Sequence, residues 1–223
     1  DLDFAAWMNL DVYRFSIEWA RVEPTRGVYD DEALAHYRAV LEAMKEREIA
    51  PSVTLHHFTE PVWFVNMEEM VEPYAETFCP EGVDGPDLCW WLDPEAPELF
   101  GAYCGRAAAE YGDLVDEWWT FNEPTGYWMN TAVTGDFPPP IPLDLLSMDQ
   151  AALEVHALPA LRGMLASHVA CYKAIHQNDT VDADGDGLAA RVGVTTGTGM
   201  SYPAKPDSPE DVAAAAQAFS LAS

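Results

Sequence analysis

Strand-like and helix-like segments alternate along this chain, and the alternation restricts its possible folds more than any other feature of the sequence. Runs rich in β-branched and aromatic residues predict strands at residues 12–17, 51–57, 114–121 and 191–196. Apolar residues at helical spacing predict helices at residues 31–48, 94–111, 149–177 and 211–221, the third of them bent at Pro159. Because strands that alternate with helices pair in parallel through right-handed crossovers, the sequence predicts an α/β fold.

A carboxylic acid follows an amide at the end of the third strand-like run. Asn122 and Glu123 come directly after residues 114–121, while Arg14 and His57 lie at or near the ends of the two preceding runs. In barrels built of strand and helix units, the carboxyl ends of the strands carry the active site. A closed barrel would therefore bring all four side chains to one mouth.

Each of these residues also has a purely structural interpretation. Arg14 could form an ion pair at a strand end, His57 could be a buried core histidine and Asn122 could shape a turn. Alternation along the strand points His56 away from the mouth, so His57 is the candidate of the adjacent pair. The histidines of the long predicted helix are interpreted as packing or surface residues: His156, His168 and His176.

The chain is strongly acidic, because 38 Asp and Glu against 11 Lys and Arg give a formal net charge of -27. Such a charge repels phosphate backbones and anionic lipids, so neither nucleic acid nor a membrane is an expected partner. The charge fits a solvated surface or an adaptation to high salt. We expect a soluble protein, cytoplasmic or secreted, whose oligomeric state the sequence leaves open.

Four cysteines are too few for a disulfide scaffold. Cys79 and Cys89 bracket a short stretch that a disulfide could close, although two such thiols would stay reduced in the cytosol. They lie within residues 65–90, which we interpret as an insertion loop. Cys104 and Cys171 fall in helical patterns and are expected to be free.

Three aspartates at alternate positions resemble the start of a calcium loop: Asp182, Asp184 and Asp186. Carboxylates at this spacing with glycines between them suit a hard cation that needs several oxygen ligands. The twelfth position of such a loop is Gly193, however, where a bidentate glutamate is expected, and Arg191 lies close by. A structural calcium ion and a plain solvated turn are therefore both possible.

Five segments form an ordered set of motifs along the chain: Tyr13-Arg14-Phe15-Ser16-Ile17-Glu18-Trp19, Val53-Thr54-Leu55-His56-His57-Phe58, Trp91-Leu92-Asp93, Thr120-Phe121-Asn122-Glu123-Pro124 and Gly135-Asp136-Phe137-Pro138-Pro139. By these segments, in this order, the chain resembles glycoside hydrolase family 1, the β-glucosidase family, over about residues 1–200. The resemblance implies a partial TIM (β/α)8 barrel over residues 1–223, with about strands two to five of eight. The first strand and the C-terminal half of the barrel would then be missing.

The resemblance also implies roles for individual residues. Glu123 matches the acid/base of a retaining β-glycosidase, which hydrolyses β-linked glucosides or related β-glycosides by double displacement and needs no cofactor. Asn122 matches the residue that hydrogen-bonds the sugar 2-hydroxyl, and His57 the residue that contacts the 3-hydroxyl. Arg14 matches the arginine beside the nucleophilic carboxylate. Phe58 replaces the usual tryptophan after the histidine, so it is a candidate substrate-binding residue.

The nucleophile of such an enzyme, a glutamate about 5 Å from the acid/base, has no match in the chain. The chain alone is therefore expected to be inactive. Alternatives are a half-barrel that binds carbohydrate or assembles with a partner without hydrolysis, and another barrel hydrolase that shares only Asn-Glu-Pro. Trp128 is a candidate platform for a sugar ring on the leaving-group side, where Thr125 replaces a tryptophan common in the family.

Overall fold

The computed structural model describes residues 1–65, 89–138, 157–197 and 202–222. It contains one four-stranded sheet in the order β1-β2-β3-β4, formed by Val12–Ser16, Ala50–Thr54, Glu117–Asn122 and Arg191–Thr195. Each strand pairs in parallel with the next one along the chain. The predicted α/β fold with parallel strands is therefore confirmed, and the order of strands is the one that a barrel requires.

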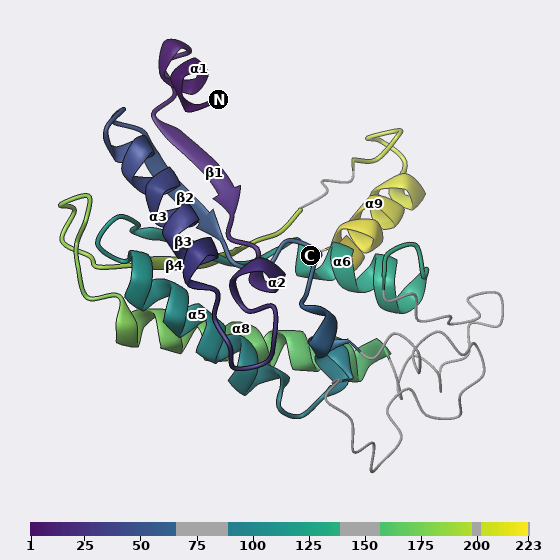
Figure 1. The fold of residues 1–223 in the computed structure, drawn as a ribbon. Helices are drawn as coiled ribbons and strands as arrows, with labels where there is room; N and C mark the ends of the chain where they lie inside the picture. Colours follow the sequence, from purple (N-terminus) through teal and green to yellow (C-terminus); the bar gives the residue numbers. More distant parts are fainter. Residues whose placement is uncertain (66–88, 139–156, 198–201, 223) are drawn as a thin grey trace.

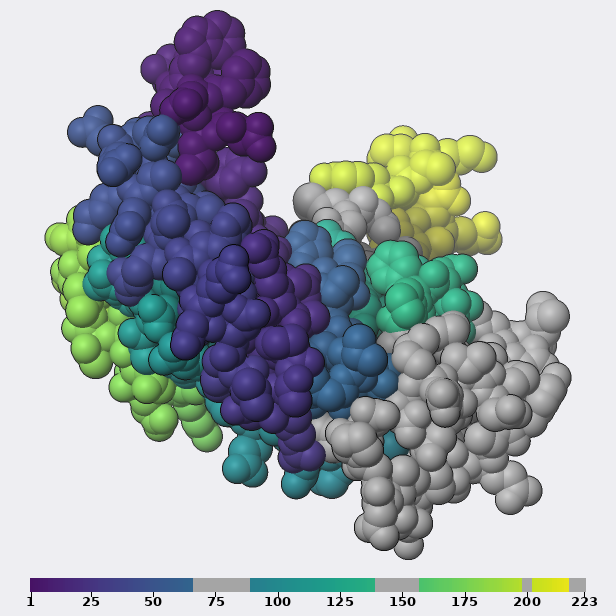
Figure 2. All heavy atoms as spheres, in the orientation of Figure 1, coloured from purple at the N-terminus to yellow at the C-terminus, as the bar shows by residue number. Residues whose placement is uncertain are grey.

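The helices of the described residues are α1 (Leu2–Trp7), α2 (Trp19–Val22), α3 (Asp31–Lys45), α5 (Ala96–Tyr111), α6 (Pro124–Trp128), α8 (Leu158–Asn178) and α9 (Pro209–Ala222), with short turns η1 (Val62–Phe64), η2 (Trp90–Leu92) and the π-helical η3 (Met129–Val133). Within this part of the chain, each of the four predicted helices follows a strand, and the structure adds three short α-helices that the sequence analysis did not predict, α1, α2 and α6. In Figure 1, α3, α5 and α8 run along one side of the sheet. In Figure 2, the N-terminal segment and α9 stand apart across an open hollow.

Some predicted boundaries differ from the structure. Strand β2 ends at Thr54, three residues before the predicted end, so His57 lies beyond the strand. Strand β3 begins at Glu117 because Val115 still belongs to the turn after α5, where its N–H donates to the carbonyl of Tyr111 at 3.1 Å. Pro159 lies in the first turn of α8, and the bend expected there involves residues 149–156, outside the described part of the chain.

The main core lies between the sheet and the helices. Val53 and Trp118 point from the sheet into this core, where they meet buried side chains of the helices such as Leu41, Phe100 and Ile175. The neighbours of Val53 in β2, Ser52 and Thr54, point to the other face of the sheet. There Ser52 accepts a hydrogen bond from Trp119 and Thr54 accepts one from Arg14. The face of the sheet away from the helices is therefore polar.

Helices α5 and α8 pack closely because small residues face each other. A Cβ atom at Gly101 would lie 3.2 Å from the Cβ of Ala170, and one at Gly105 would lie 3.5 Å from that of Ala174. This approach brings the Cα atoms of Cys104 and Cys171 to 5.3 Å, and the two residues form a disulfide. The expectation that both thiols are free was therefore wrong. Cys89 is not a free thiol either, while Cys79, its expected partner, lies outside the described residues.

Gly163 allows α8 to approach the turn η2, and we expect Gly163→Ala to destabilise the protein. A Cβ at this position would lie 1.8 Å from the carbonyl oxygen of Trp91, so the helix or the turn would have to shift. Overpacking of this kind typically costs about 1–3 kcal/mol, which exceeds the gain of about 1 kcal/mol from the better helix propensity of alanine. Denaturant unfolding of the full-length protein measures this loss.

Gly105→Ala is the matched control, since it makes the same substitution in α5. The added Cβ would meet the flexible amide end of Asn178 at 3.1 Å, which can move away. We expect its free energy of unfolding to equal or exceed that of the wild type. If the two variants lost stability equally, close packing at Gly163 would not be the cause.

Asp179 is buried after the end of α8, and its titration should make stability depend on pH. Its carboxylate accepts a hydrogen bond from Trp118 Nε1 at 2.9 Å, and burial raises its pKa to about 6. The folded state therefore binds a proton that the unfolded state has already released above pH 4. Stability from this group is present at pH 4 and is lost as the pH rises through 6.

Asp179→Asn removes this titration while it keeps an acceptor for Trp118. The variant should gain stability relative to the wild type between pH 4 and pH 7, by about 2–3 kcal/mol. Denaturant unfolding of both proteins at several pH values gives this difference, and all other carboxylates cancel from it. A difference that stays constant with pH would show that Asp179 has an ordinary pKa.

Candidate active site

A bulge in β3 turns Asn122 toward the polar face of the sheet. Trp119 pairs with Gly193 and Asn122 with Thr195, so three steps along β3 match two along β4. The extra residue reverses the alternation. Thr120, which precedes the reversal, hydrogen-bonds His168 of α8, whereas Asn122 reaches across the sheet on the other side.

Arg14 joins three strands at this face. Its Nε donates to Thr54 Oγ1 of β2 at 2.9 Å, and its Nη2 donates to Asn122 Oδ1 of β3 at 3.0 Å. The guanidinium carbon lies 5.9 Å from the centroid of the Trp119 ring. These contacts fix the orientation of both the Arg14 guanidinium and the Asn122 amide.

His57 lies just beyond β2 and is close enough to the other candidates to respond to their charges. Its Nδ1 lies 3.2 Å from Ser16 Oγ of β1. Partial burial lowers the pKa of His57, the positive charge of Arg14 lowers it further, and the negative charge of Glu123 opposes both. The imidazole is therefore favoured in its neutral form, which can both donate and accept a hydrogen bond.

Glu123 is held between β4 and α6 by its backbone. Its N–H donates to the carbonyl of Thr195 at 2.7 Å, and its own carbonyl accepts from the N–H of Tyr127 at 2.8 Å. The residue has a left-handed conformation, with φ of 42° and ψ of 56°, which is unfavourable for a side chain with a Cβ. Its carboxylate is exposed at the carboxyl end of β3. Backbone strain of this kind is concentrated at functional sites.

The predicted site residues thus meet at one end of the sheet. Arg14 hydrogen-bonds to Asn122, and Glu123 is the next residue in the chain. The charges of Arg14 and Glu123 both influence the pKa of His57, so His57 lies near them. The group offers a carboxyl that can transfer a proton, together with fixed polar groups that can bind hydroxyls. It is suited to general acid/base chemistry on a polar, neutral substrate.

Phe58 lies beside this group in an aromatic cluster. Its ring stacks on Tyr127 with centroids 5.5 Å apart and contacts Phe137 at the same separation. It also lines a cavity of about 200 Å³ with residues that include Val62 and Pro138. Trp128 has a different setting, because its Nε1 donates to the carbonyl of Ala157 at 2.6 Å and its ring packs against the core.

Two other carboxylates near the strands, Glu117 and Glu18, have partners of their own. Glu117 lies at the amino end of β3, where its Oε1 accepts from Ser52 at 2.5 Å and from Trp119 at 3.1 Å. Glu18 caps α2 and accepts from the Thr59 hydroxyl at 2.7 Å. Neither position gives a reason to assign a nucleophile within the described part of the chain.

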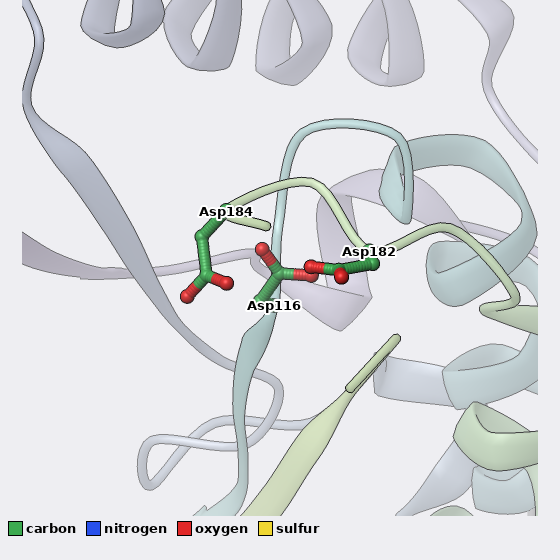
Figure 3. A group of neighbouring side chains, drawn as sticks. All are labelled: Asp116, Asp182 and Asp184. Atoms are coloured by element: carbon green, nitrogen blue, oxygen red, sulfur yellow. The ribbon is translucent and has the colours of Figure 1, made fainter. Parts of the chain in front are cut away.

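The loop of acidic residues before β4 lies beside Asp116, which directly precedes β3, so that Asp116, Asp182 and Asp184 lie close together, as Figure 3 shows. Asp182 accepts hydrogen bonds from the N–H groups of Gly185, Asp186 and Gly187, and Arg191 forms ion pairs with Asp184 and Asp186. Backbone N–H groups of the loop and the guanidinium of Arg191 therefore already supply hydrogen bonds and positive charge to these carboxylates. Calcium binding here stays a prediction that calorimetric titration after chelation would test.

Sequence reasoning missed the groups that hold the site in place. Thr54 and Trp119 contact Arg14 from neighbouring strands, and Ser16 contacts His57. Their alternation along the strands could have placed them on the same face as Arg14.

The other histidines of the described residues have different surroundings from His57. His56 points into the core as expected. His168 is half-buried and His176 packs on Tyr172, while His156 lies outside the described residues.

Consecutive parallel strand and helix units, with acidic and polar side chains at one end of the sheet, are typical of part of a (β/α)8-barrel enzyme. The chain belongs to glycosyl hydrolase family 1, because the sequence profile of that family matches residues 1–72 and 83–223. A β-galactosidase from Pyrococcus woesei is 28% identical over 96% of this chain and 45% of its own length. The coniferin β-glucosidase of Pinus contorta is 31% identical over 62% of this chain and 23% of its own.

Solved structures agree with this assignment. A β-glycosidase from Pyrococcus horikoshii superposes with a TM-score of 0.71 and 26% identity, over 99% of this chain and 42% of that one. A rice β-glucosidase gives a TM-score of 0.76 at 23% identity, over 99% and 41%, and shows the fold alone. The chain spans less than half the length of these relatives. None of the helices in the described ranges has the length and hydropathy needed to cross a membrane.

Proposed function

We propose that the protein containing this chain is a retaining β-glycosidase that acts on β-linked glucosides or related β-glycosides. The proposal is carried by one observation: Arg14 of β1 reaches across β2 and donates a hydrogen bond to Asn122 at the carboxyl end of β3, and Asn122 directly precedes Glu123. The relatives named above are glycosidases, which gives no support to a non-hydrolytic half-barrel. The expected ligand is a β-glycoside or an oligosaccharide.

In this proposal Glu123 acts twice. It first gives a proton to the glycosidic oxygen while a carboxylate nucleophile attacks the anomeric carbon, so the leaving group departs as an alcohol. It then takes a proton from a water molecule, which attacks the same carbon and releases the nucleophile. Asn122 and His57 hold sugar hydroxyls, and Arg14 lies beside the nucleophile and favours its ionised form. The nucleophile would come from a part of the protein outside these 223 residues.

The test is the stereochemistry of the reaction. We expect the full-length protein to hydrolyse 4-nitrophenyl β-glucoside or β-galactoside and to release the β-anomer of the sugar first, which proton NMR follows before mutarotation. Retention requires two displacements at the anomeric carbon. Initial release of the α-anomer, or no hydrolysis of any β-glycoside, would contradict the proposal.

A further inference from the structure

A buried carboxylate lies beneath the candidate site, and no part of the proposed chemistry uses it. The side chain of Glu60 is only 4% exposed. Its Oε1 accepts from His56 Nε2 at 2.9 Å, Trp90 Nε1 at 3.1 Å, Trp91 Nε1 at 2.9 Å and the Tyr127 hydroxyl at 2.7 Å. Burying a carboxylate is costly unless it is hydrogen-bonded, and this one is bonded by four side chains.

These four partners come from three separate parts of the chain. His56 follows β2, Trp90 and Trp91 form η2, and Tyr127 belongs to α6. Rings of the same residues pack against one another, with His56 5.1 Å from Tyr127 and Trp90 5.9 Å from Tyr127 between centroids. Glu60 therefore acts as a common acceptor that fixes three segments relative to each other.

The backbone around this carboxylate is strained at several points. Phe58 has φ of 71°, Trp90 has φ of 55° and Glu123 has φ of 42°, although none of them is glycine. Such conformations persist only where the surrounding structure determines them fully. Trp90 donates to Glu60, Phe58 stacks on Tyr127, and Tyr127 donates to Glu60. The Glu60 contacts thus supply a restraint next to each strained residue.

Tyr127 connects Glu60 to the candidate acid/base. Its hydroxyl donates to both oxygens of Glu60, at 2.7 and 2.9 Å, while its backbone N–H donates to the Glu123 carbonyl at 2.8 Å. Because Glu123 caps the N-terminus of α6, any rotation of this short helix would move the Glu123 backbone. Anchoring Tyr127 therefore fixes the direction in which Glu123 points.

We propose that Glu60 is a positioning residue for Glu123, acting through Tyr127 and the first turn of α6. This inference rests on the proposed function, since it gives Glu60 a part in orienting the proton donor. The alternative is that Glu60 only stabilises the core. The two differ in one respect: a misplaced proton donor slows substrates in proportion to their need for protonation, whereas a loss of stability alone does not.

The experiment compares two substrates in the full-length protein, by kcat/KM for the first step. A methyl β-glycoside needs protonation of its leaving group, and a 2,4-dinitrophenyl β-glycoside needs little. Glu60→Met removes the common acceptor and keeps the length of the side chain. We expect kcat/KM for the methyl glycoside to fall by about 10²-fold more than for the dinitrophenyl glycoside, as misplacement of a catalytic group by about 1 Å would cause.

Two further variants separate positioning from folding. Tyr127→Phe removes a single hydroxyl and keeps the ring that stacks on Phe58, so it should fold and shift the substrate ratio in the same direction. Glu60→Gln keeps an acceptor oxygen and should restore most of the methyl glycoside activity lost in Glu60→Met. If Glu60→Met does not fold, the Tyr127→Phe ratio decides the question.

Glu23→Met is the matched control. Glu23 is also buried, and it accepts from Trp19 Nε1 at 2.8 Å and the Gly27 N–H at 2.7 Å in another turn. The Glu23→Met variant should lower the melting temperature without changing the ratio of kcat/KM between the methyl and dinitrophenyl glycosides. Equal losses on both substrates in Glu60→Met and Tyr127→Phe, with an active wild type, would overturn the positioning role alone. A wild type that hydrolyses neither substrate would overturn the proposed function as well.

Discussion

Replacing Glu123 with glutamine in the full-length protein should lower kcat/KM for a methyl β-glycoside by about 10²- to 10⁴-fold, the usual contribution of a general acid. The amide keeps the shape of the side chain but is too weak an acid to protonate the glycosidic oxygen. The same variant should hydrolyse a 2,4-dinitrophenyl β-glycoside with nearly unchanged kcat/KM, because that leaving group departs as a stable anion. Steady-state kinetics with both substrates measures the contrast.

Glu117→Gln is the matched control for this experiment, since it makes the same change in the same strand. Glu117 lies at the amino end of β3, where it accepts from Ser52 and Trp119. Its loss should leave the ratio between the two substrates unchanged. If Glu123→Gln slowed both substrates by the same factor, Glu123 would not be the proton donor.

Loss of the disulfide between α5 and α8 should cause the largest change in stability. Cys104 and Cys171 are separated by 67 residues and both are fully buried. A cross-link that closes a loop of this length restricts the unfolded chain, and the chain-entropy relation gives a stabilisation of about 4 kcal/mol. The double replacement of both cysteines by alanine should therefore lower the free energy of unfolding by about that amount.

The single replacements provide the control. Either Cys104→Ala or Cys171→Ala already breaks the bond, so each should destabilise nearly as much as the double variant. Denaturant unfolding without reductant gives the three values. If the losses of the two single variants added up to that of the double variant, the bond would not form. Alkylation of both Cys104 and Cys171 in the unfolded wild type, located by peptide mass mapping, would show the same.

The sequence predicted the strands, their parallel pairing and the end of the sheet at which the candidate residues meet. Those features depend on local composition and on the position of polar residues after each strand, as with Asn122 and Glu123 after β3. The end of β2 was less predictable. His56 and His57 continue the composition of the strand, but the chain leaves the sheet before them and reaches a left-handed Phe58.

Contacts between distant segments were not predictable from local patterns. The disulfide depends on how closely α5 and α8 approach, which the small residues at Gly101 and Ala170 determine only once the helices face each other. Glu60 follows a strand in a segment with no periodicity, so nothing near it indicates a buried carboxylate. Its role becomes visible only when Trp90, Trp91 and Tyr127 converge on it.

The central claim is that Glu123 serves as the acid/base of a retaining β-glycosidase, and rescue by azide tests it most directly. In Glu123→Ala, the glycosyl-enzyme formed from a 2,4-dinitrophenyl β-glycoside should accumulate, because no base activates water. Azide needs no base and should restore turnover, giving a β-glycosyl azide that proton NMR identifies. Turnover that does not respond to azide, with free sugar as the only product, would contradict the claim.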